Sequence, residues 1–532
     1  DPDELHDALL VSGTLTDEEM ARWPEWRDRL EAAGRTARQG DLWLAAERRE
    51  LSDVERVRGR LEIAGPVTAE QLAAMIRLPR AAVDAALLAI EADGVVLRGH
   101  FTPGVEDLEW CERRLLARIH RYTISRLRSE IEPVTPAQFS SFLFEWQHVT
   151  PDHRTAGLEG LAAVLGQLEG FEVPAGAWET DVLSARSVDY DPQLLDSLSL
   201  MGRVMWARVS PPSPSLRGAI SGPLRSTPIA LLRREHLGAW HALAGDVERT
   251  PRGANAALVL SVLDAGGAMF FHDLVTRTGL LGTQVEGALA ELAALGLVTA
   301  DGFTGLRALI TPESRRPPIA GASRRRHRSI AFGVESAGRW ARLAGSSGGP
   351  DSADPGHGAT NTGREAAVEH LARTLLNRYG VMFRKLLARE AFSVPWRELL
   401  RTYWRLEARG EVRGGRFVSG IAGEQFALPD AVTRLRAVRR AGPQGQLTAL
   451  SAADPLNLTG ILSPEDRVAA LAGNRIVYED GIPVVVKEGG ETRWLAALPP
   501  ERERLAEEAL IRKRVSASLR ARLGIPRAIS SR

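Results

Sequence analysis

The chain has 532 residues, 44% of them apolar, and its 68 basic and 67 acidic side chains nearly cancel. This length and apolar content predict several globular domains, while the balanced charge excludes a bulk electrostatic case for a polyanion partner, so any such contact must be local. The single cysteine, Cys111, excludes an internal disulfide and a cysteine metal cluster. No apolar run reaches the roughly 18 residues of a membrane span. We therefore expect a cytoplasmic chain without a membrane partner.

One short sequence pattern recurs and predicts the architecture. An aliphatic residue four before a glycine and a valine two after it occur in segments 90–96, 198–204, 292–298 and 406–412. Glycine suits a helix end at φ > 0. A residue that can open a helix of about four turns lies fifteen positions before three of these glycines: Pro79, Leu281 and Pro395. The repeat predicts winged helices; the alternative is coincidence in a chain rich in Ala, Leu and Gly.

The repeat and the composition divide the chain into predicted domains. In order, we expect a compact or truncated winged helix (1–50), a winged helix (51–108), a long basic helix with a divergent winged helix (109–250), a winged helix (251–344), a Gly/Ser-rich linker (345–363) and a winged helix (364–440).

The pattern changes period near the end. Five short extended runs between 447 and 496, one of them at 459–462, are punctuated by turn pairs such as Asp480-Gly481. They predict a small β-barrel (441–500), and a C-terminal helix (501–532) follows. The expected fold class is therefore mainly α with small β, in the form of tandem winged helices followed by a barrel and a helix.

The winged helix at 364–440 has the most basic third helix. Arg397, Arg401 and Arg405 recur every four residues along 395–407, so they share one face beside Trp404. Further basic residues flank this helix or open the equivalent helix of the 51–108 domain: Arg384, Lys385, Arg413, Arg416 and Arg80. A basic face of this kind predicts contact with the nucleic-acid backbone; the alternative is a helix that packs through its tryptophans.

Catalytic signatures are scarce. The sequence has no phosphate-loop, HExxH or Gly-x-Ser-x-Gly motif, and no cofactor or metal site is predicted. Asp454, at a turn entering the predicted barrel, is the nearest thing to a catalytic carboxylate. The alternative for this Asp-Pro is a turn initiator.

Four stretches are distinctive: EWCERRLLARIHRYTISRLRSEIEPV (109–134), FLFEWQHV (142–149), GRFVSGIAGEQFALP (415–429) and SAADPLNLTGIL (451–462). They resemble the C-terminal region of Lhr, the large helicase-related proteins of bacteria. The resemblance implies a superfamily 2 DNA helicase that tracks 3′ to 5′, whose motor, with its ATP and Mg²⁺, precedes this region. It also implies similarity to AlkZ-like DNA glycosylases, although their Gln-apolar-Gln/Asp motif does not carry over, because the Gln-x-Gln here is Gln444-Gly445-Gln446.

Two hypotheses follow from the resemblance. The first is a DNA-repair module that binds single-stranded or damaged duplex DNA in the nucleoid, next to the helicase core, and forms a homo-oligomer, with a tetramer expected. The second is a DNA glycosylase that removes uracil or a damaged base.

Overall fold

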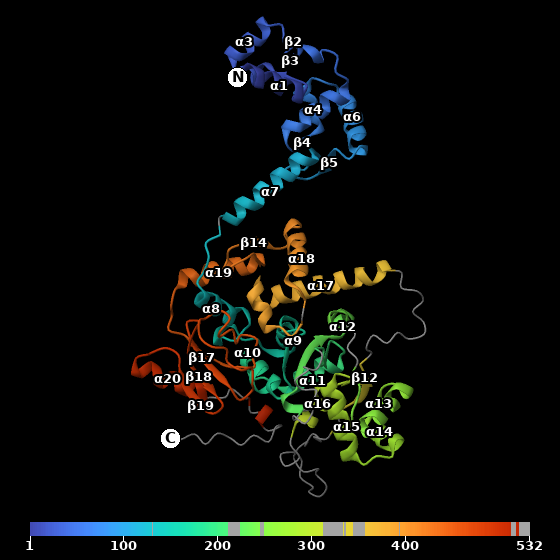
Figure 1. The fold of residues 1–532 in the computed structure, drawn as a ribbon, viewed down its shortest axis with the longest axis vertical. Helices are drawn as coiled ribbons and strands as arrows, with labels where there is room; N and C mark the ends of the chain where they lie inside the picture. Colours follow the sequence, from blue (N-terminus) through green and yellow to red (C-terminus); the bar gives the residue numbers. More distant parts are fainter. Residues whose placement is uncertain are drawn as a thin grey trace. The chain divides into compact units, whose positions relative to one another are not determined.

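The computed structural model describes residues 1–129, 131–210, 224–244, 249–311, 334, 337–343, 357–392, 394–511, 516 and 518–520. The chain divides into two compact units, Asp1–Glu130 and Ile131–Arg532, which we take separately (Figure 1). None of the helices in the described part combines the length and the apolar character that a membrane span requires.

The first unit contains two modules of one design, each with a three-stranded sheet whose third strand lies between the other two. The first module consists of α1 (Pro2–Ser12), β1 (Leu15–Thr16), α2 (Asp17–Met20), α3 (Pro24–Ala32), β2 (Thr36–Gln39) and β3 (Leu42–Ala45). The second consists of α4 (Asp53–Ala64), β4 (Val67–Thr68), α5 (Ala69–Ile76), α6 (Arg80–Ala92), β5 (Val96–Gly99) and β6 (Glu109–Glu112). Helix α7 (Arg113–Ser129) follows.

The second unit contains three modules with the same strand order. One follows α8 (Pro136–Trp146) and consists of α9 (Gly157–Gln167), β7 (Glu172–Pro174), α10 (Ser184–Arg186), α11 (Pro192–Leu200), β8 (Val204–Ala207) and β9 (Pro228–Arg233). After α12 (Leu237–Ala244), the next consists of α13 (Ala254–Gly266), β10 (Met269–Phe270), α14 (Phe271–Thr278), α15 (Gly282–Leu295), β11 (Val298–Ala300), α16 (Phe303–Ile310) and β12 (Arg339–Arg342).

The last module leads into a separate sheet. It consists of α17 (His357–Tyr379), β13 (Val381–Phe383), the 3-10 helix η10 (Arg384–Arg389), α18 (Trp396–Ala408), β14 (Arg413–Gly415) and β15 (Gln425–Ala427), followed by α19 (Pro429–Ala441). The order helix, strand, helix, helix and hairpin, with the third strand central, is that of a winged helix. The winged-helix architecture expected from the sequence is therefore confirmed.

Glycine forms the corner between the third helix and the hairpin. Gly94, Gly202, Gly296 and Gly410 have φ of 70°, 73°, 70° and 75°. In each corner the N–H after the glycine donates to the carbonyl five residues earlier, as Glu411 does to Leu406. This bond satisfies a carbonyl that the helix end would otherwise leave unpaired, and the positive φ explains the recurrence of glycine.

Helix starts are also locally encoded. Thr16, Ser52, Thr68 and Thr135 each accept a hydrogen bond from the backbone N–H three residues on, and the Glu or Gln side chain at that position accepts one from the backbone N–H of the cap residue. Such reciprocal capping satisfies two amides that have no partner inside the helix.

Two predicted segments differ from the structure. Glu109–Glu112 belongs to strand β6, which pairs with β4 and β5, rather than to a long helix from residue 109. This strand buries Trp110 and Cys111, and the basic helix starts only at Arg113. The sequence did not indicate this boundary between strand and helix, because a strand of four residues is too short to show a clear alternation of apolar and polar residues beside the periodic apolar residues of α7.

The predicted barrel is an open sheet in the part of the chain that the structure describes. β16 (Leu447–Ser451), β17 (Arg475–Glu479), β18 (Ile482–Glu488) and β19 (Glu491–Trp494) pair antiparallel in chain order, and the two outer strands do not close on each other. The run at 459–462 forms turns, in which Ile461 and Leu462 donate to the Leu458 carbonyl.

Two predictions fall partly outside the described residues. Of the linker predicted at 345–363, residues 345–356 lie outside them and α17 begins at His357. Of the helix predicted at 501–532, α20 (Pro500–Ile511) is described, and most of the remainder lies outside.

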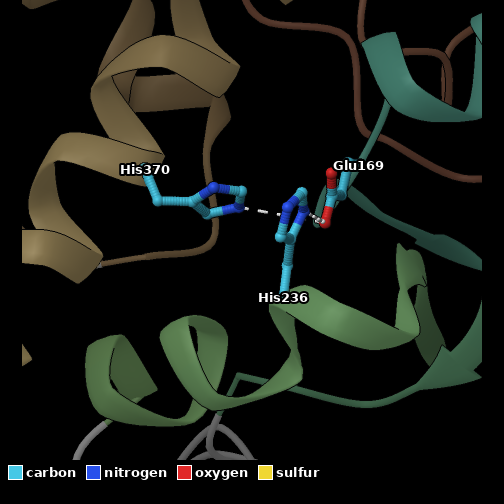
Figure 2. A group of neighbouring side chains, drawn as sticks. All are labelled: Glu169, His236 and His370. Atoms are coloured by element: carbon cyan, nitrogen blue, oxygen red, sulfur yellow. Dashed lines mark hydrogen bonds and ion pairs between the residues drawn. The ribbon is translucent and has the colours of Figure 1, made fainter.

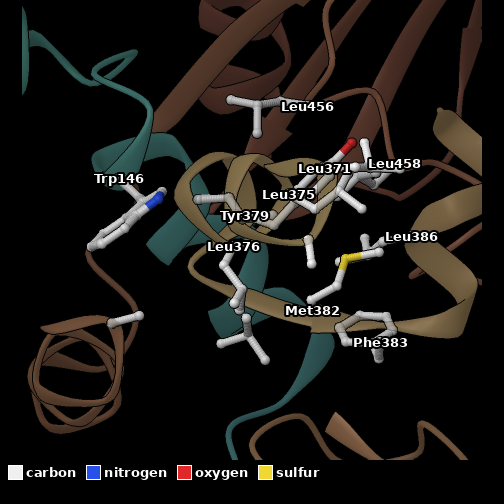
Figure 3. Packing of buried hydrophobic residues seen from close by; sticks show 14 of the residues in the cluster. Trp146, Leu371, Leu375, Leu376, Tyr379, Met382, Phe383, Leu386, Leu456 and Leu458 are labelled. Atoms are coloured by element: carbon white, nitrogen blue, oxygen red, sulfur yellow. The ribbon is translucent and has the colours of Figure 1, made fainter. Parts of the chain in front are cut away.

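A shared core holds the second unit together. Figure 3 shows Leu371, Leu375, Leu376 and Tyr379 of α17 packed among residues of other elements, including Trp146 of α8 and Leu456 of the turn after β16. The same cluster includes Met205 of β8, Phe426 of β15 and Ile476 of β17; these and the labelled residues of α17 are nearly inaccessible to solvent. The winged helix at 134–234, the winged helix at 361–447 and the four-stranded sheet therefore share one core and form one packed body.

Candidate nucleic-acid interface

Helix α18 separates an apolar face from a basic one. Its buried residues are Leu399, Thr402, Tyr403 and Leu406. Arg397, Arg401 and Arg405 are exposed and lie on the opposite side, because their spacing of four keeps them in one row. The predicted stripe of arginines is therefore present on the surface.

The stripe arginines differ in their partners. Arg405 lies 3.6 Å from Glu365, whereas Arg397 and Arg401 have no ion pair within the described residues. Four more predicted cations are exposed and likewise lack an ion pair there: Arg384 and Lys385 in η10, Arg413 in β14 and Arg416 just after it. One winged helix thus presents six cations without an ion pair to any described residue, on its second helix, third helix and wing.

An exposed aromatic ring accompanies the stripe. Trp404 is 44% exposed, and its Nε1 donates to Glu424 over 2.7 Å. The helix is not anchored through this ring; Tyr403, which stacks on Phe426 with ring centroids 5.1 Å apart, has that role. A flat, accessible ring between arginines can stack on an unpaired base.

Arg80 lies in the other unit and is already engaged. Its Nε is 3.0 Å from Asp84 and its Nη1 3.2 Å from Glu70, and the hydrogen bond to Asp84 raises the pKa of the guanidinium. An arginine with two carboxylate partners contributes less net charge to a phosphate-binding surface than an unpaired one.

Asp454 is enclosed in a buried network. Its carboxylate oxygens lie 2.6 and 2.8 Å from the two terminal nitrogens of Arg186, and both side chains are at most 1% exposed. Gln147 accepts from Arg186, and the Leu456 amide donates to Asp454. This last bond is the turn geometry of the alternative interpretation. Asp454 is 0% exposed, and its catalytic role stays a prediction.

Another carboxylate lines a small cavity that the sequence did not indicate. The cavity, of about 220 Å³, lies between α8 and the four-stranded sheet. Glu465 lines it, and its Oε2 is shielded from solvent without a hydrogen-bond partner in the described part of the chain. The Tyr478 hydroxyl, 2.9 Å from Thr459, contributes a second polar group. The mostly apolar walls with few polar groups are typical of a small-molecule pocket.

The fold and the basic face define a tandem winged-helix protein with a cationic third helix. Residues 361–447 and 134–234 match two models described as the winged-helix domain of large helicase-related (Lhr) proteins, the fourth and the third such domain respectively. These matches confirm the resemblance to the C-terminal region of Lhr.

Two curated proteins are similar over most of the chain. The first, from Mycolicibacterium smegmatis and named Lhr helicase/probable uracil glycosylase, is 30% identical over 470 residues, which are 84% of this chain and 29% of that protein. The second, Lhr helicase/uracil glycosylase from Escherichia coli, is 27% identical over 432 residues, 75% of this chain and 26% of that protein. The chain thus spans under a third of the length of these relatives.

Proposed function

We propose that this chain is a DNA-binding region of an Lhr-type helicase and that the winged helix at 361–447 makes the main contact. The observation that carries the proposal is the row of exposed arginines on α18, of which Arg397 and Arg401 have no ion pair within the described residues. Phosphate contacts release counterions and supply most of the sequence-independent affinity.

The exposed ring of Trp404 favours single-stranded or locally opened DNA. Stacking of a base on an aromatic side chain contributes about 1–3 kcal/mol and needs an unpaired base. The adjacent arginines would hold the flanking phosphates. W404A should therefore weaken binding to single strands more than binding to intact duplex.

The salt dependence of binding tests the surface. Each phosphate contact adds about 0.9 to the slope of log affinity against log salt on duplex DNA, so R397Q/R401Q should lower the slope by about 1.8. The matched control is R373Q/R409Q: it removes the same charge from exposed arginines of the same winged helix, but both are paired with Glu369. Equal slopes for the parent and R397Q/R401Q, both folded, would reject this surface.

The helicase context and the assembly state belong to the same proposal. In the full-length protein, a 3′ to 5′ motor would move along the strand that this region holds, and the region itself would form a homo-oligomer. Scattering mass of the chain with and without DNA tests the oligomer; a monomer under both conditions would remove that part.

A second candidate function is base excision, which both relatives carry in their names. The Glu465 cavity favours it, because a glycosylase must hold an extruded base in a pocket and position water with a polar group. E465Q should then abolish alkali-revealed cleavage of uracil-containing single strands while leaving DNA affinity unchanged. Cleavage at the parental rate in E465Q would assign the activity elsewhere.

A further inference from the structure

Three side chains that commonly bind metals meet inside the second unit. Glu169 follows α9, His236 ends the 3-10 helix η7 (Arg234–His236), and His370 lies on α17. Figure 2 shows the two imidazoles and the carboxylate converging, and one donor atom of each lies within 4.8 Å of the other two. Segments that are far apart in sequence thus present a carboxylate and two ring nitrogens to one point.

The distances are close to those of a tetrahedral site. His236 Nδ1 lies 2.8 Å from Glu169 Oε1, and His370 Nε2 lies 3.8 Å from the same oxygen. Zinc bonds of about 2.0–2.2 Å at tetrahedral angles separate their donor atoms by about 3.3–3.5 Å. The two observed separations lie on either side of this range, so side-chain shifts of about half an ångström would bring the donors into place.

The Glu169 carboxylate has no ion pair with an arginine or a lysine among the described residues. Glu169 is 3% exposed, and within the described residues its carboxylate forms ion pairs only with the two histidines. The remaining partners of the carboxylate there are neutral donors, Trp240 Nε1 at 3.1 Å and the Arg233 amide at 3.3 Å, while the Arg378 guanidinium donates to the backbone carbonyl of Glu169. Because a buried carboxylate is costly unless its charge is compensated, the site favours an additional positive charge.

His370 has an unused donor atom. Its Nε2 is shielded from solvent and has no hydrogen-bond partner among the residues that the structure describes, although it points toward the carboxylate. A buried polar atom without a partner is uncommon in folded proteins, and an unoccupied ion position is one explanation. The imidazoles of His236 and His370 are 29% and 20% exposed, so the cluster lies close to the protein surface.

Neighbouring groups already contact the carboxylate and His236. Trp240 donates to Glu169, and Glu235 lies 3.6 Å from the outer nitrogen of His236. A carboxylate next to the second nitrogen of a ligating histidine is a recurrent support in metal sites.

We propose that Glu169, His236 and His370 bind one divalent transition-metal ion, zinc by preference, that joins the winged helix at 134–234 to the one at 361–447. Two imidazoles and one carboxylate with an open fourth position are a zinc-type ligand set. Because Glu169 and His236 are near one winged helix and His370 belongs to the other, the ion would hold the two together.

Equilibrium dialysis of the EDTA-treated 532-residue chain against zinc, followed by metal analysis, tests the site. One zinc per chain is expected. H236Q and H370Q should each weaken it at least about 100-fold, since loss of the groups that merely support ligands already costs about 10–100-fold. H272A is the matched control, because His272 is an exposed histidine of the same unit, and it should bind zinc as the parent does.

Two further measurements keep the result decisive. Zinc should raise the melting temperature of the parent and of H272A but not that of H370Q. The parent with cobalt should show the visible absorption of a four-coordinate site, a result that depends on no variant. Equal zinc retention by the parent and H236Q/H370Q, or no cobalt spectrum in the parent, would show that the cluster is only a hydrogen-bonded carboxylate and two histidines.

Discussion

The substitution D454N removes the negative partner of a buried ion pair. Arg186 then keeps its positive charge at 0% exposure, and its side-chain partners are neutral, the amide oxygens of the new asparagine and of Gln147. Breaking a buried pair in this way costs about 3–5 kcal/mol, mainly through the uncompensated charge. D454N should therefore destabilise the second unit whatever its effect on activity.

The expected shift follows from the size of the unit. At about 2.1 cal/mol/K per residue, a unit of about 400 residues has an unfolding entropy of about 0.84 kcal/mol/K. A loss of 3–5 kcal/mol then lowers the melting temperature by about 4–6 °C if the unit melts as one. Differential scanning calorimetry measures this shift directly.

Two control variants distinguish the effect of the unpaired charge from the effect of replacing any aspartate. D466N changes an exposed aspartate of the same region and should melt within about 1 °C of the parent. R186M/D454L replaces the pair by apolar groups and should recover most of the loss. If D454N melted like the parent but abolished base excision, Asp454 would be a catalytic residue and the structural reasoning would be wrong.

Replacing Gly410 by alanine should cost about 1–2 kcal/mol, because φ is 75° although no atom lies within 4 Å of the new Cβ; urea midpoints measure it. Burial raises the pKa of Cys111 from 9.0 to about 11, so alkylation at pH 8 should be at least about 100-fold slower than in urea, and equal rates would contradict the burial. Burial alone would raise the pKa of Glu19, but hydrogen bonds from Arg60 and Thr16 lower it on balance. The first unit should therefore lose stability as the pH falls below 4.5, and E19Q should reduce this dependence in an acid titration followed by tryptophan fluorescence.

Local rules predicted the corners of the fold. A glycine at positive φ depends only on neighbours along the chain, so the sequence shows it. The third strands were harder, because β6 and β12 have four residues each and are defined by partners that lie elsewhere in the chain. The barrel was wrong for the same reason: runs of extended residues do not reveal whether the first strand meets the last.

Some features of the candidate site could also be predicted from local spacing, and others could not. The spacing of Arg397 and Arg401 placed them on one face, and Asp84, four residues after Arg80, was a readable sign that this arginine is engaged. Arg186 and Asp454 are 268 positions apart, so no local sequence pattern predicts their pairing. The convergence of Glu169 with His370 is equally invisible, because it depends on how two modules pack.

The central position of every third strand has a consequence for synthesis on the ribosome. β10 and β11 make their ladder bonds only with β12, so a nascent chain that ends before Arg339 presents two short strands with no neighbour to pair with. Each module must therefore wait for its last strand to emerge before its sheet can form. Expression boundaries placed inside a wing would leave unsatisfied backbone groups, and such fragments should aggregate where fragments ending after the strand remain monodisperse.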